Sequence, residues 1–471
     1  MKSADKIFSL FTLAVFIGLL LPVLLKDGMF LDGVTYSCIS KNLANNIGEL
    51  WKPHYTKTLY PAFYEHPPLV FGIQSLFFRL MGNGIYPERI YSFFTAIFVL
   101  IGIILNWKLF TNNSKFQTSY WLPILLWILT PVVFWSFGNN MLENTLSVFT
   151  VFSVYFICKA LIQVKVLWLI PGGVLVLLSF LSKGFVGLFP LVSIIFYSLI
   201  FRNIKINRTI LYTLLILLVP IGLLFILIFL FPESKNNITH YFNRQLIPSL
   251  RNENEITTDY RIGIILKLIT ELLFPLIILG IYLIRSRFTK YRTIFSYNKA
   301  AIFFICIGLS ASIPIIITLK QRGYYLVPSI PFFVIGLSLF LCDPINNLIE
   351  KIPSQIKLWL KRLAIILVLF SLLLSLLSIG KINRDKEKLH DIYILTRKIP
   401  PGTIIGTIKE NCSDWGLIAY LGRMGYLSLD SDNKHEYFLL NKENIIDSTL
   451  LKQYQEVSLG LLKFKLLQRI N

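Results

Sequence analysis

The chain is organised around one polar stretch, Asp27-Gly28-Met29-Phe30-Leu31-Asp32-Gly33-Val34-Thr35-Tyr36, which Tyr64-Glu65-His66-Pro67-Pro68-Leu69 completes. It follows the first long apolar block, Ile7 to Leu25, and marks the first point at which the chain leaves a membrane. Acids, aromatic residues and a His-Pro-Pro turn gather there, although only 15% of the chain is charged. We interpret this stretch as an active-site loop.

The composition is that of a polytopic membrane protein. The 471 residues are 55% hydrophobic, their mean hydropathy is +0.65, and long apolar blocks recur as far as residue 380. No small-residue cleavage site follows the first block, so we expect a retained helix and not a signal peptide. These features exclude a soluble enzyme.

Apolar segments of bilayer length recur along the chain. They are expected at roughly 7–25, 86–108, 119–137, 143–161, 166–181, 184–201, 209–231, 262–285, 299–318, 323–341 and 358–380. Residues 67–82 are apolar but short, and they open with two prolines. If they lie at the interface without crossing it, the short basic loops, including 285–299, all fall on one side, as the positive-inside rule requires. We therefore expect about eleven spans, an interfacial helix at 67–82, and an outside C-terminus.

This topology collects the unusual polar residues on the outer face. The two long outer loops are 26–85 and 232–261. The outer residues of interest are Asp32, Glu65, His66, Glu143, Asn144, Lys183, Gly184, residues 240–244 and residues 320–325. No motif was used to orient the chain, so this convergence independently supports a site at the outer membrane surface.

The C-terminal 383–471 segment is polar and forms a separate small α/β domain in this interpretation, with 1–382 as an all-α membrane domain. Strands are expected at 403–407, 426–430, 437–441 and 461–466, and a helix at 414–423.

The net charge and the cysteine spacing argue against two kinds of site, a nucleic-acid surface and a cysteine metal centre. The net charge is +21, but the basic residues are scattered among short loops, which argues for membrane orientation and against nucleic-acid binding. The five cysteines show no metal-type spacing. Cys38 and Cys412 both fall in polar segments, so a disulfide between them stays open.

Five motifs, taken in their order along the chain, resemble those of a known family. They are Asp32-x-x-x-Tyr36, Glu65-x-Pro67-Pro68-Leu69, Glu143, Lys183-Gly184 and Tyr325-Leu326-x-Pro328. Between about Ile7 and Leu341 the chain resembles the lipid-linked-sugar glycosyltransferases of the protein mannosyltransferase and aminoarabinose transferase superfamily, glycosyltransferase families 39 and 83. The resemblance implies the GT-C fold, with about eleven transmembrane helices.

The resemblance also implies an activity and a location. The donor would be a polyprenyl-phosphate sugar, such as an undecaprenyl phosphate derivative, and the acceptor a lipid such as lipid A, a glycan or a protein. The protein would lie among the lipids of the bacterial inner membrane, with its site and C-terminal domain on the periplasmic face.

Residue roles follow position by position from the resemblance. Asp32, Glu65 and Glu143 would be catalytic acids, Glu143 standing where relatives usually have Asp. Tyr36, His66, Lys183 and Tyr325 would bind substrate. Thr35 and His66 replace cations, Arg and Lys, that would hold the donor phosphate, so the positive charge must come from Lys183, Arg244 or Arg322.

The required chemistry can be argued independently. A polyprenyl-linked sugar phosphate keeps its phosphate at the interface, where Arg or Lys stabilises the charge that grows as the anomeric bond breaks. A carboxylate on the opposite side of the sugar accepts the proton of the attacking hydroxyl, with inversion expected. We assign Asp32 that role. If the acceptor is itself a phosphate, Asp32 would only position it.

Each assignment has a structural alternative. Asp32 could cap a helix that begins at Gly33, and Glu143 could stabilise a helix N-terminus. Glu65-His66 could form a polar turn, and His240 could be solvated. Arg322 and Tyr325 could be interface anchors.

Glu65, with His240, could bind a divalent metal ion, although the spacing is not diagnostic.

Two further alternatives concern the whole protein. A transporter would place acids near the middle of the membrane, whereas the acids here lie at one face. A non-catalytic envelope assembly protein is the third class.

Overall fold

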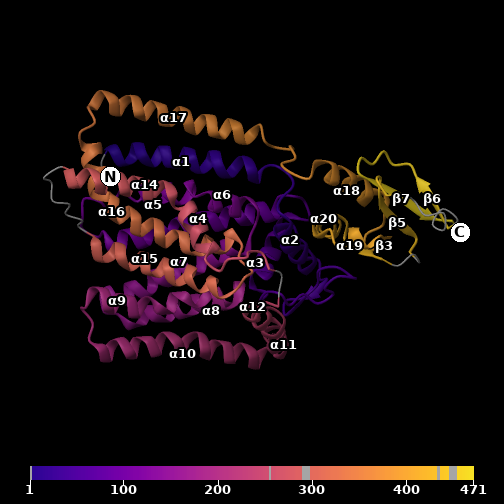
Figure 1. Ribbon diagram of the computed structural model, residues 1–471, viewed down its shortest axis with the longest axis horizontal. Helices are drawn as coiled ribbons and strands as arrows, with labels where there is room; N and C mark the ends of the chain where they lie inside the picture. The colour runs from indigo at the N-terminus through magenta and orange to yellow at the C-terminus, as the bar shows by residue number, and fades with distance from the viewer. Residues whose placement is uncertain (1–2, 254–255, 289–296, 432–434, 445–452, 471) are drawn as a thin grey trace.

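The computed structural model describes residues 3–253, 256–288, 297–431, 435–444 and 453–470. Long helices run side by side along the long axis of the molecule, and a small domain with a β-sheet lies at one end of the bundle (Figure 1). The N-terminus and the C-terminus lie at opposite ends (Figure 1). This arrangement confirms the expected helical membrane domain with a small C-terminal α/β domain.

The helices of the bundle correspond to the apolar blocks. Their bounds are α1 Ser3–Leu24, α4 Pro87–Phe110, α5 Trp121–Leu129, α6 Pro131–Gly138, α7 Leu142–Gln163, η1 Val166–Trp168, α8 Leu169–Lys183, η2 Gly184–Val192, α9 Ser193–Phe201, α10 Ile206–Leu230, α13 Gly263–Glu271, α14 Leu273–Phe288, α15 Asn298–Ser312, η4 Ile313–Ile317, η5 Gly323–Ser329, α16 Ile330–Glu350 and α17 Ser354–Leu376.

In the described part of the chain, eight helical segments are long and apolar enough to cross a membrane, and two bent pairs raise the number to ten. The pair α5 and α6 bends by 74°, and the pair α13 and α14 by 70°. Pro131 explains the first bend, because a proline disfavours helical geometry at the preceding residue, Thr130. The expected spans 119–137 and 262–285 are therefore broken helices.

The segment Val166–Phe201 is counted above as one span but folds back on itself. A Cβ on Gly187 would lie 2.5 Å from the backbone carbonyl carbon of Ser179. Eight residues of straight helix would separate these positions by about 12 Å. The chain therefore reverses near Gly184, and the expected segments 166–181 and 184–201 are the two arms of this hairpin. This division accounts for the difference between about eleven expected spans and ten.

The loop 26–85, the first of the two expected outer loops, contains two helices, α2 Leu31–Ala44 and α3 Leu69–Met81. With 13 residues, α3 is shorter than a bilayer span and corresponds to the short helix expected at 67–82. The two-residue strands β1 Gly48–Glu49 and β2 Lys52–Pro53 lie between the two helices. The second outer loop contains α11 Pro232–Tyr241, η3 Phe242–Leu246 and α12 Ile247–Arg251.

The C-terminal domain contains a five-stranded mixed sheet in the order β4-β3-β5-β7-β6. Its β3 pairs in parallel with β4 and β5, and β7 pairs antiparallel with β5 and β6. The elements are α18 Lys386–Lys398, β3 Ile404–Thr407, α19 Lys409–Cys412, α20 Trp415–Gly425, β4 Ser428–Asp430, β5 Tyr437–Asn441, β6 Tyr454–Val457 and β7 Phe464–Arg469. The expected strands and the expected helix are confirmed, whereas α18 and β6 were missed.

The first outer loop and the C-terminal domain share one hydrophobic core. Tyr36, Cys38 and Ile39 of α2 are buried in it together with Leu389 and Leu421 of the C-terminal domain. This packing fixes the domain to the helix that begins at the polar stretch. Cys38 and the partly buried Cys412 are both free thiols, so they form no disulfide. The basic loop 285–299, which helped to orient the chain, lies largely outside the described residues.

Candidate active site

Asp32 is held by a tyrosine from a distant part of the chain. It is the second residue of α2, whose N-cap is Phe30 without a side-chain capping hydrogen bond. The Tyr324 hydroxyl donates a hydrogen bond to Oδ2 of Asp32 at 3.0 Å. Asp32 therefore does not cap the helix, and its carboxylate points toward η5. An acid in the first helical turn is also stabilised by the helix dipole.

Three cations surround this carboxylate. Lys183, Lys320 and Arg322 each lie close enough to Asp32 to favour its charged form. Burial nevertheless dominates and raises the pKa of the Asp32 carboxyl above its usual value. A raised pKa makes the carboxylate a stronger base, which suits proton abstraction.

Glu143 and Lys183 form a buried ion pair beside Asp32. The Lys183 ammonium donates to Oε1 of Glu143, and the Lys183 and Glu143 side chains are only 10% and 1% exposed, respectively. The Lys183 ammonium also lies 4.6 Å from the centre of the Tyr325 ring and 5.6 Å from that of Tyr324. Oε2 of Glu143 is buried and has no hydrogen-bond partner in the described part of the chain. This oxygen can accept a hydrogen bond from a substrate.

Tyr36 and His66 form the next layer of the site. The Tyr36 hydroxyl lies 3.5 Å from Nε2 of His66, at the limit of a hydrogen bond. Burial lowers the pKa of His66 well below its usual value, and the charges of Lys183 and Lys320 lower it further. Nδ1 of His66 is buried without a hydrogen-bond partner among the described residues. The neutral imidazole therefore has one ring nitrogen left for a ligand.

Glu65 and His240 lie in the same region, and each contacts a tyrosine. The Tyr60 hydroxyl donates to Oε1 of Glu65 at 2.8 Å. Burial raises the pKa of Glu65, while this hydrogen bond and the charge of Lys320 lower it. The His240 ring stacks on Tyr64, with centroids 4.8 Å apart. In the described ranges, no three His, Cys, Asp or Glu side chains are grouped as a metal site.

Arg244 lies at the outer edge of the cluster. It is exposed in η3 and acts electrostatically on Tyr60 and Tyr64, the residues that contact Glu65 and His240. The structure thus brings together the predicted Asp32, Tyr36, Glu65, His66, Glu143, Lys183, Arg322 and Tyr325, with His240 and Arg244 at the rim.

Comparisons with known proteins agree with this architecture. Residues 65–229 match the profile of the family described as dolichyl-phosphate-mannose-protein mannosyltransferase. This match covers about a third of the chain and makes that part similar to the family. No protein with a curated description matches the sequence.

Two solved structures share the fold of this chain over nearly its whole length. ArnT from Cupriavidus metallidurans bound to undecaprenyl phosphate is 13% identical, with a TM-score of 0.66 over 98% of this chain and 97% of that chain. ArnT from the same organism in the apo state is 15% identical, with a TM-score of 0.64 over 97% and 96%. At this identity the likeness concerns the fold alone. With this fold and its long apolar helices, the chain is an integral polytopic membrane protein.

Sequence reasoning missed three residues of the site. Tyr324, and not its neighbour Tyr325, contacts Asp32, and Lys320 faces Asp32, Glu65 and His66. Tyr60 holds Glu65. All of them lie within or beside stretches that the sequence analysis singled out. The only signal in the sequence was that these residues lie within a few positions of a motif. Such proximity does not show which side chains point into the site.

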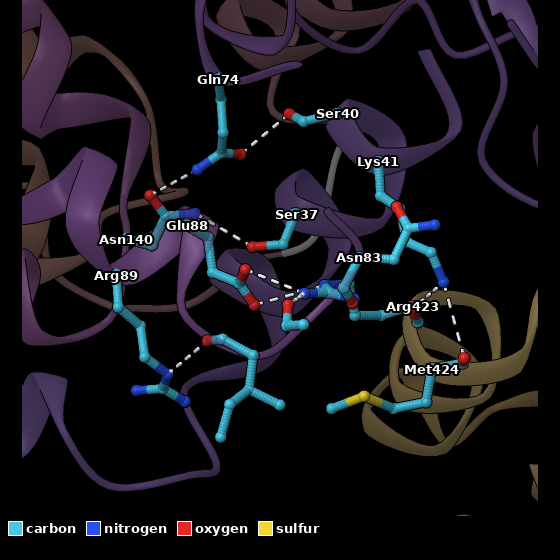
Figure 2. A network of polar contacts seen from close by, with 12 residues as sticks. Ser37, Ser40, Lys41, Gln74, Asn83, Glu88, Arg89, Asn140, Arg423 and Met424 are labelled. Atoms are coloured by element: carbon cyan, nitrogen blue, oxygen red, sulfur yellow. Dashed lines mark hydrogen bonds and ion pairs between the residues drawn. The ribbon is translucent and has the colours of Figure 1, made fainter. Parts of the chain in front are cut away.

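A polar network seats α2 against its neighbours, as Figure 2 shows. Gln74 of α3 donates from Nε2 to Oδ1 of Asn140 at 2.8 Å and accepts from the Ser40 hydroxyl at 2.8 Å. Asn140 in turn donates to the Ser37 hydroxyl at 3.1 Å. Gly33 completes the fit, because a Cβ there would lie 1.9 Å from the Asn139 carbonyl oxygen. The helix that presents Asp32 therefore packs closely against α3 and the chain at residues 139–140.

A cavity of about 330 Å³ lies beside the site. Its walls include Trp135, Asn139 and Arg384. Trp135 stacks on Tyr324 with centroids 5.7 Å apart, and the Arg384 guanidinium lies 5.7 Å from the centre of the Phe30 ring. An aromatic face among amide and charged side chains suits a hydroxyl-rich or anionic group.

Proposed function

We propose that this protein is a membrane glycosyltransferase that moves a sugar from a polyprenyl-phosphate donor to an extracytoplasmic acceptor, with Asp32 as the general base. The observation that carries this proposal is the Asp32 carboxylate itself. It is partly buried, has one oxygen fixed by Tyr324, and faces Lys183, Lys320 and Arg322. The base can accept the proton of the attacking hydroxyl, and the cations can stabilise the negative charge that develops on the leaving phosphate.

The step follows from this arrangement. The acceptor hydroxyl oxygen attacks the anomeric carbon, and the bond from that carbon to the phosphate oxygen breaks with its electron pair leaving on the phosphate. Asp32 takes the hydroxyl proton, and Lys320 and Arg322 stabilise the released phosphate charge. Attack from the side opposite the phosphate inverts the anomeric configuration.

Glu65, Glu143 and the neighbouring side chains would bind substrate in this proposal. Oε2 of Glu143 is an open acceptor for a sugar hydroxyl, and Nδ1 of His66 an open position for the donor. Lys183 neutralises Glu143 and keeps its carboxylate in place. Arg244 and His240 at the rim would meet the donor's outer parts.

The donor lipid and the cellular location belong to the same proposal. The ArnT structure contains undecaprenyl phosphate, and the shared fold supports a related lipid here. The positive-inside pattern supports a bacterial inner membrane protein whose site and C-terminal domain face the periplasm. The acceptor in this proposal is a lipid, a glycan or a protein, and it would bind at the cavity lined by Trp135, whose ring stacks on Tyr324.

Transfer from a panel of short-chain polyprenyl-phosphate sugars to membrane acceptors tests the proposal. Wild type is compared with Asp32→Asn, and Asp259→Asn in the exposed part of the second outer loop is the matched control. We expect transfer by wild type and Asp259→Asn, and no transfer by Asp32→Asn although it still binds donor. Wild type that neither binds nor transfers any donor would overturn the proposal and favour a transporter or an assembly protein.

A further inference from the structure

Helix α20 of the C-terminal domain contacts the chain just before α2. The Tyr420 hydroxyl accepts a hydrogen bond from the Met29 N–H at 3.1 Å. The same hydroxyl lies 3.0 Å from the Met29 carbonyl oxygen and 3.2 Å from Oδ2 of Asp385, either of which can accept its proton. The buried Tyr420 side chain thus holds the backbone N–H and carbonyl of Met29, two residues before the start of α2.

The other end of α2 is held by the same helix. The Lys41 ammonium donates to the Arg423 carbonyl oxygen at 2.7 Å. Between the two ends, Gly422 packs so closely that a Cβ there would lie 2.9 Å from Sγ of Cys38. Because Tyr420 and Arg423 are three residues apart on a helix, they lie on the same face. One turn of α20 therefore packs on α2 and makes contacts at both of its ends.

Arg423 anchors α20 to the membrane domain, as the right-hand side of Figure 2 shows. Its guanidinium pairs with both carboxylate oxygens of Glu88, at 3.2 and 2.9 Å, and donates to the Asn83 and Gly84 carbonyls. Its side chain is 1% exposed, and it lies over the Phe78 ring at 4.8 Å. Bidentate, buried pairs of this kind fix geometry strongly. The domain is thus a rigid support.

Helix α2 needs such a support at its N-terminus. Its N-cap, Phe30, provides no side-chain hydrogen bond to the first turn. The neighbouring restraint is the Phe30 N–H, which donates to Oδ1 of Asn139 at 2.6 Å. Asp32 lies three residues after Met29, so the Tyr420 contact lies just before the helical turn that carries Asp32.

We propose that the C-terminal domain is a positioning element of the active site. Tyr420, backed by Arg423, holds the start of α2 in the one orientation that places Asp32 against Tyr324. Tyr420 and Arg423 are positioning residues, because they act on the reaction through α2 and not by touching substrate. The inference rests on the proposed role of Asp32.

The test measures the protonation of Asp32 directly, in the full chain in detergent. Isotope-edited infrared difference spectra between each protein and its Asp32→Asn counterpart give the titration midpoint of the Asp32 carboxyl without any substrate. In Tyr420→Phe the start of α2 is released, the hydrogen bond from Tyr324 weakens, and the midpoint moves to higher pH. Lys41→Met, which removes the other tether, moves it in the same direction.

Two comparisons separate positioning from a general loss of structure. Thr58→Val removes the hydrogen bond from the Thr58 hydroxyl to the Leu429 carbonyl, a contact between the domain and the outer loop that does not involve α2, and it leaves the midpoint unchanged. In Tyr324→Phe the midpoint also rises, and adding Tyr420→Phe raises it no further, because the affected hydrogen bond is already gone. A wild-type midpoint in Tyr420→Phe, or full additivity in the double variant, would overturn the proposal.

Activity provides the second readout. Tyr420→Phe lowers kcat by about tenfold and leaves the donor KM within about twofold, because a displaced base affects chemistry more than binding. If wild type shows no transfer, the proposed function fails, whereas the infrared titration still reports whether α20 positions Asp32. An unchanged kcat together with a shifted midpoint would deny that positioning matters for the reaction.

Discussion

The Tyr324 hydroxyl lies 3.0 Å from Oδ2 of Asp32 and donates a hydrogen bond to it, although the two residues are 292 positions apart. Asp32 is the second residue of α2, and Tyr324 is the second residue of η5, which leads into the membrane helix α16. The contact joins α2 to η5, the two elements that carry the N-terminal and the C-terminal residues of the site. It also stabilises the charged form of Asp32 against the effect of burial.

Removing this hydroxyl is expected to shift the pH dependence of transfer. The Tyr324 hydrogen bond lowers the pKa of Asp32, so Tyr324→Phe raises it. A base is active only above its pKa, and the acid limb of the pH–rate profile therefore moves to higher pH. Profiles of kcat/KM for wild type and variant measure the shift, with exposed Tyr260→Phe as control. Superimposable acid limbs would remove Asp32 from the role of base.

The buried Glu143–Lys183 pair predicts a non-additive loss of stability. Lys183→Met leaves the Glu143 carboxylate buried without its cation, which costs about 3–5 kcal/mol. Glu143→Gln in the same chain removes that isolated charge, so the double variant melts at a higher temperature than Lys183→Met alone. Thermal unfolding of the purified variants in detergent checks this order. Additive losses in the double variant would show that the two groups do not interact.

Gly184 cannot be replaced by alanine without moving Tyr241. A Cβ there would lie 1.9 Å from the Tyr241 hydroxyl oxygen, and its φ of +77° is unfavourable for other residues. We expect Gly184→Ala to cost on the order of 1–3 kcal/mol in stability and to displace Lys183. Gly222→Ala is the control, because no heavy atom lies within 4 Å of its added Cβ. Equal melting temperatures for the two variants would contradict the prediction.

Lys41 predicts a stability that increases with pH. Burial and the charge of Arg423 lower the pKa of Lys41 to about 8 from its usual 10.5. Between these values the unfolded chain binds more protons than the folded chain, so the free energy of unfolding rises with pH in that interval. Below about pH 8 both states are protonated and the Lys41 contribution is constant.

The measurement for Lys41 is a difference between two proteins. The unfolding free energy of wild type minus that of Lys41→Met is followed from pH 7 to 10, so that contributions from tyrosines cancel. This difference is expected to increase with pH. A flat or falling difference would show that Lys41 is not buried as described.

Much of the architecture was predictable because it depends on local properties of the chain. Apolar length predicted the spans, including the two that are broken, and alternating strand residues predicted most of the C-terminal sheet. Polar residues at the ends of apolar blocks predicted the site. Helix α18 was missed because charged residues dominate it, and strand β6 was missed because it has only four residues.

The sequence by itself determined a polytopic membrane protein with acids and cations gathered at one face, since hydropathy and charge fix which segments enter a bilayer. Only the tertiary structure decided that Tyr324 holds Asp32, that Lys183 pairs with Glu143, and that α20 lies along α2. Each of these contacts joins residues far apart in the chain. In the tight turn of η5, the directions of Tyr324 and Tyr325 are set by the surrounding helices, and no local pattern encodes which of the two faces the carboxylate.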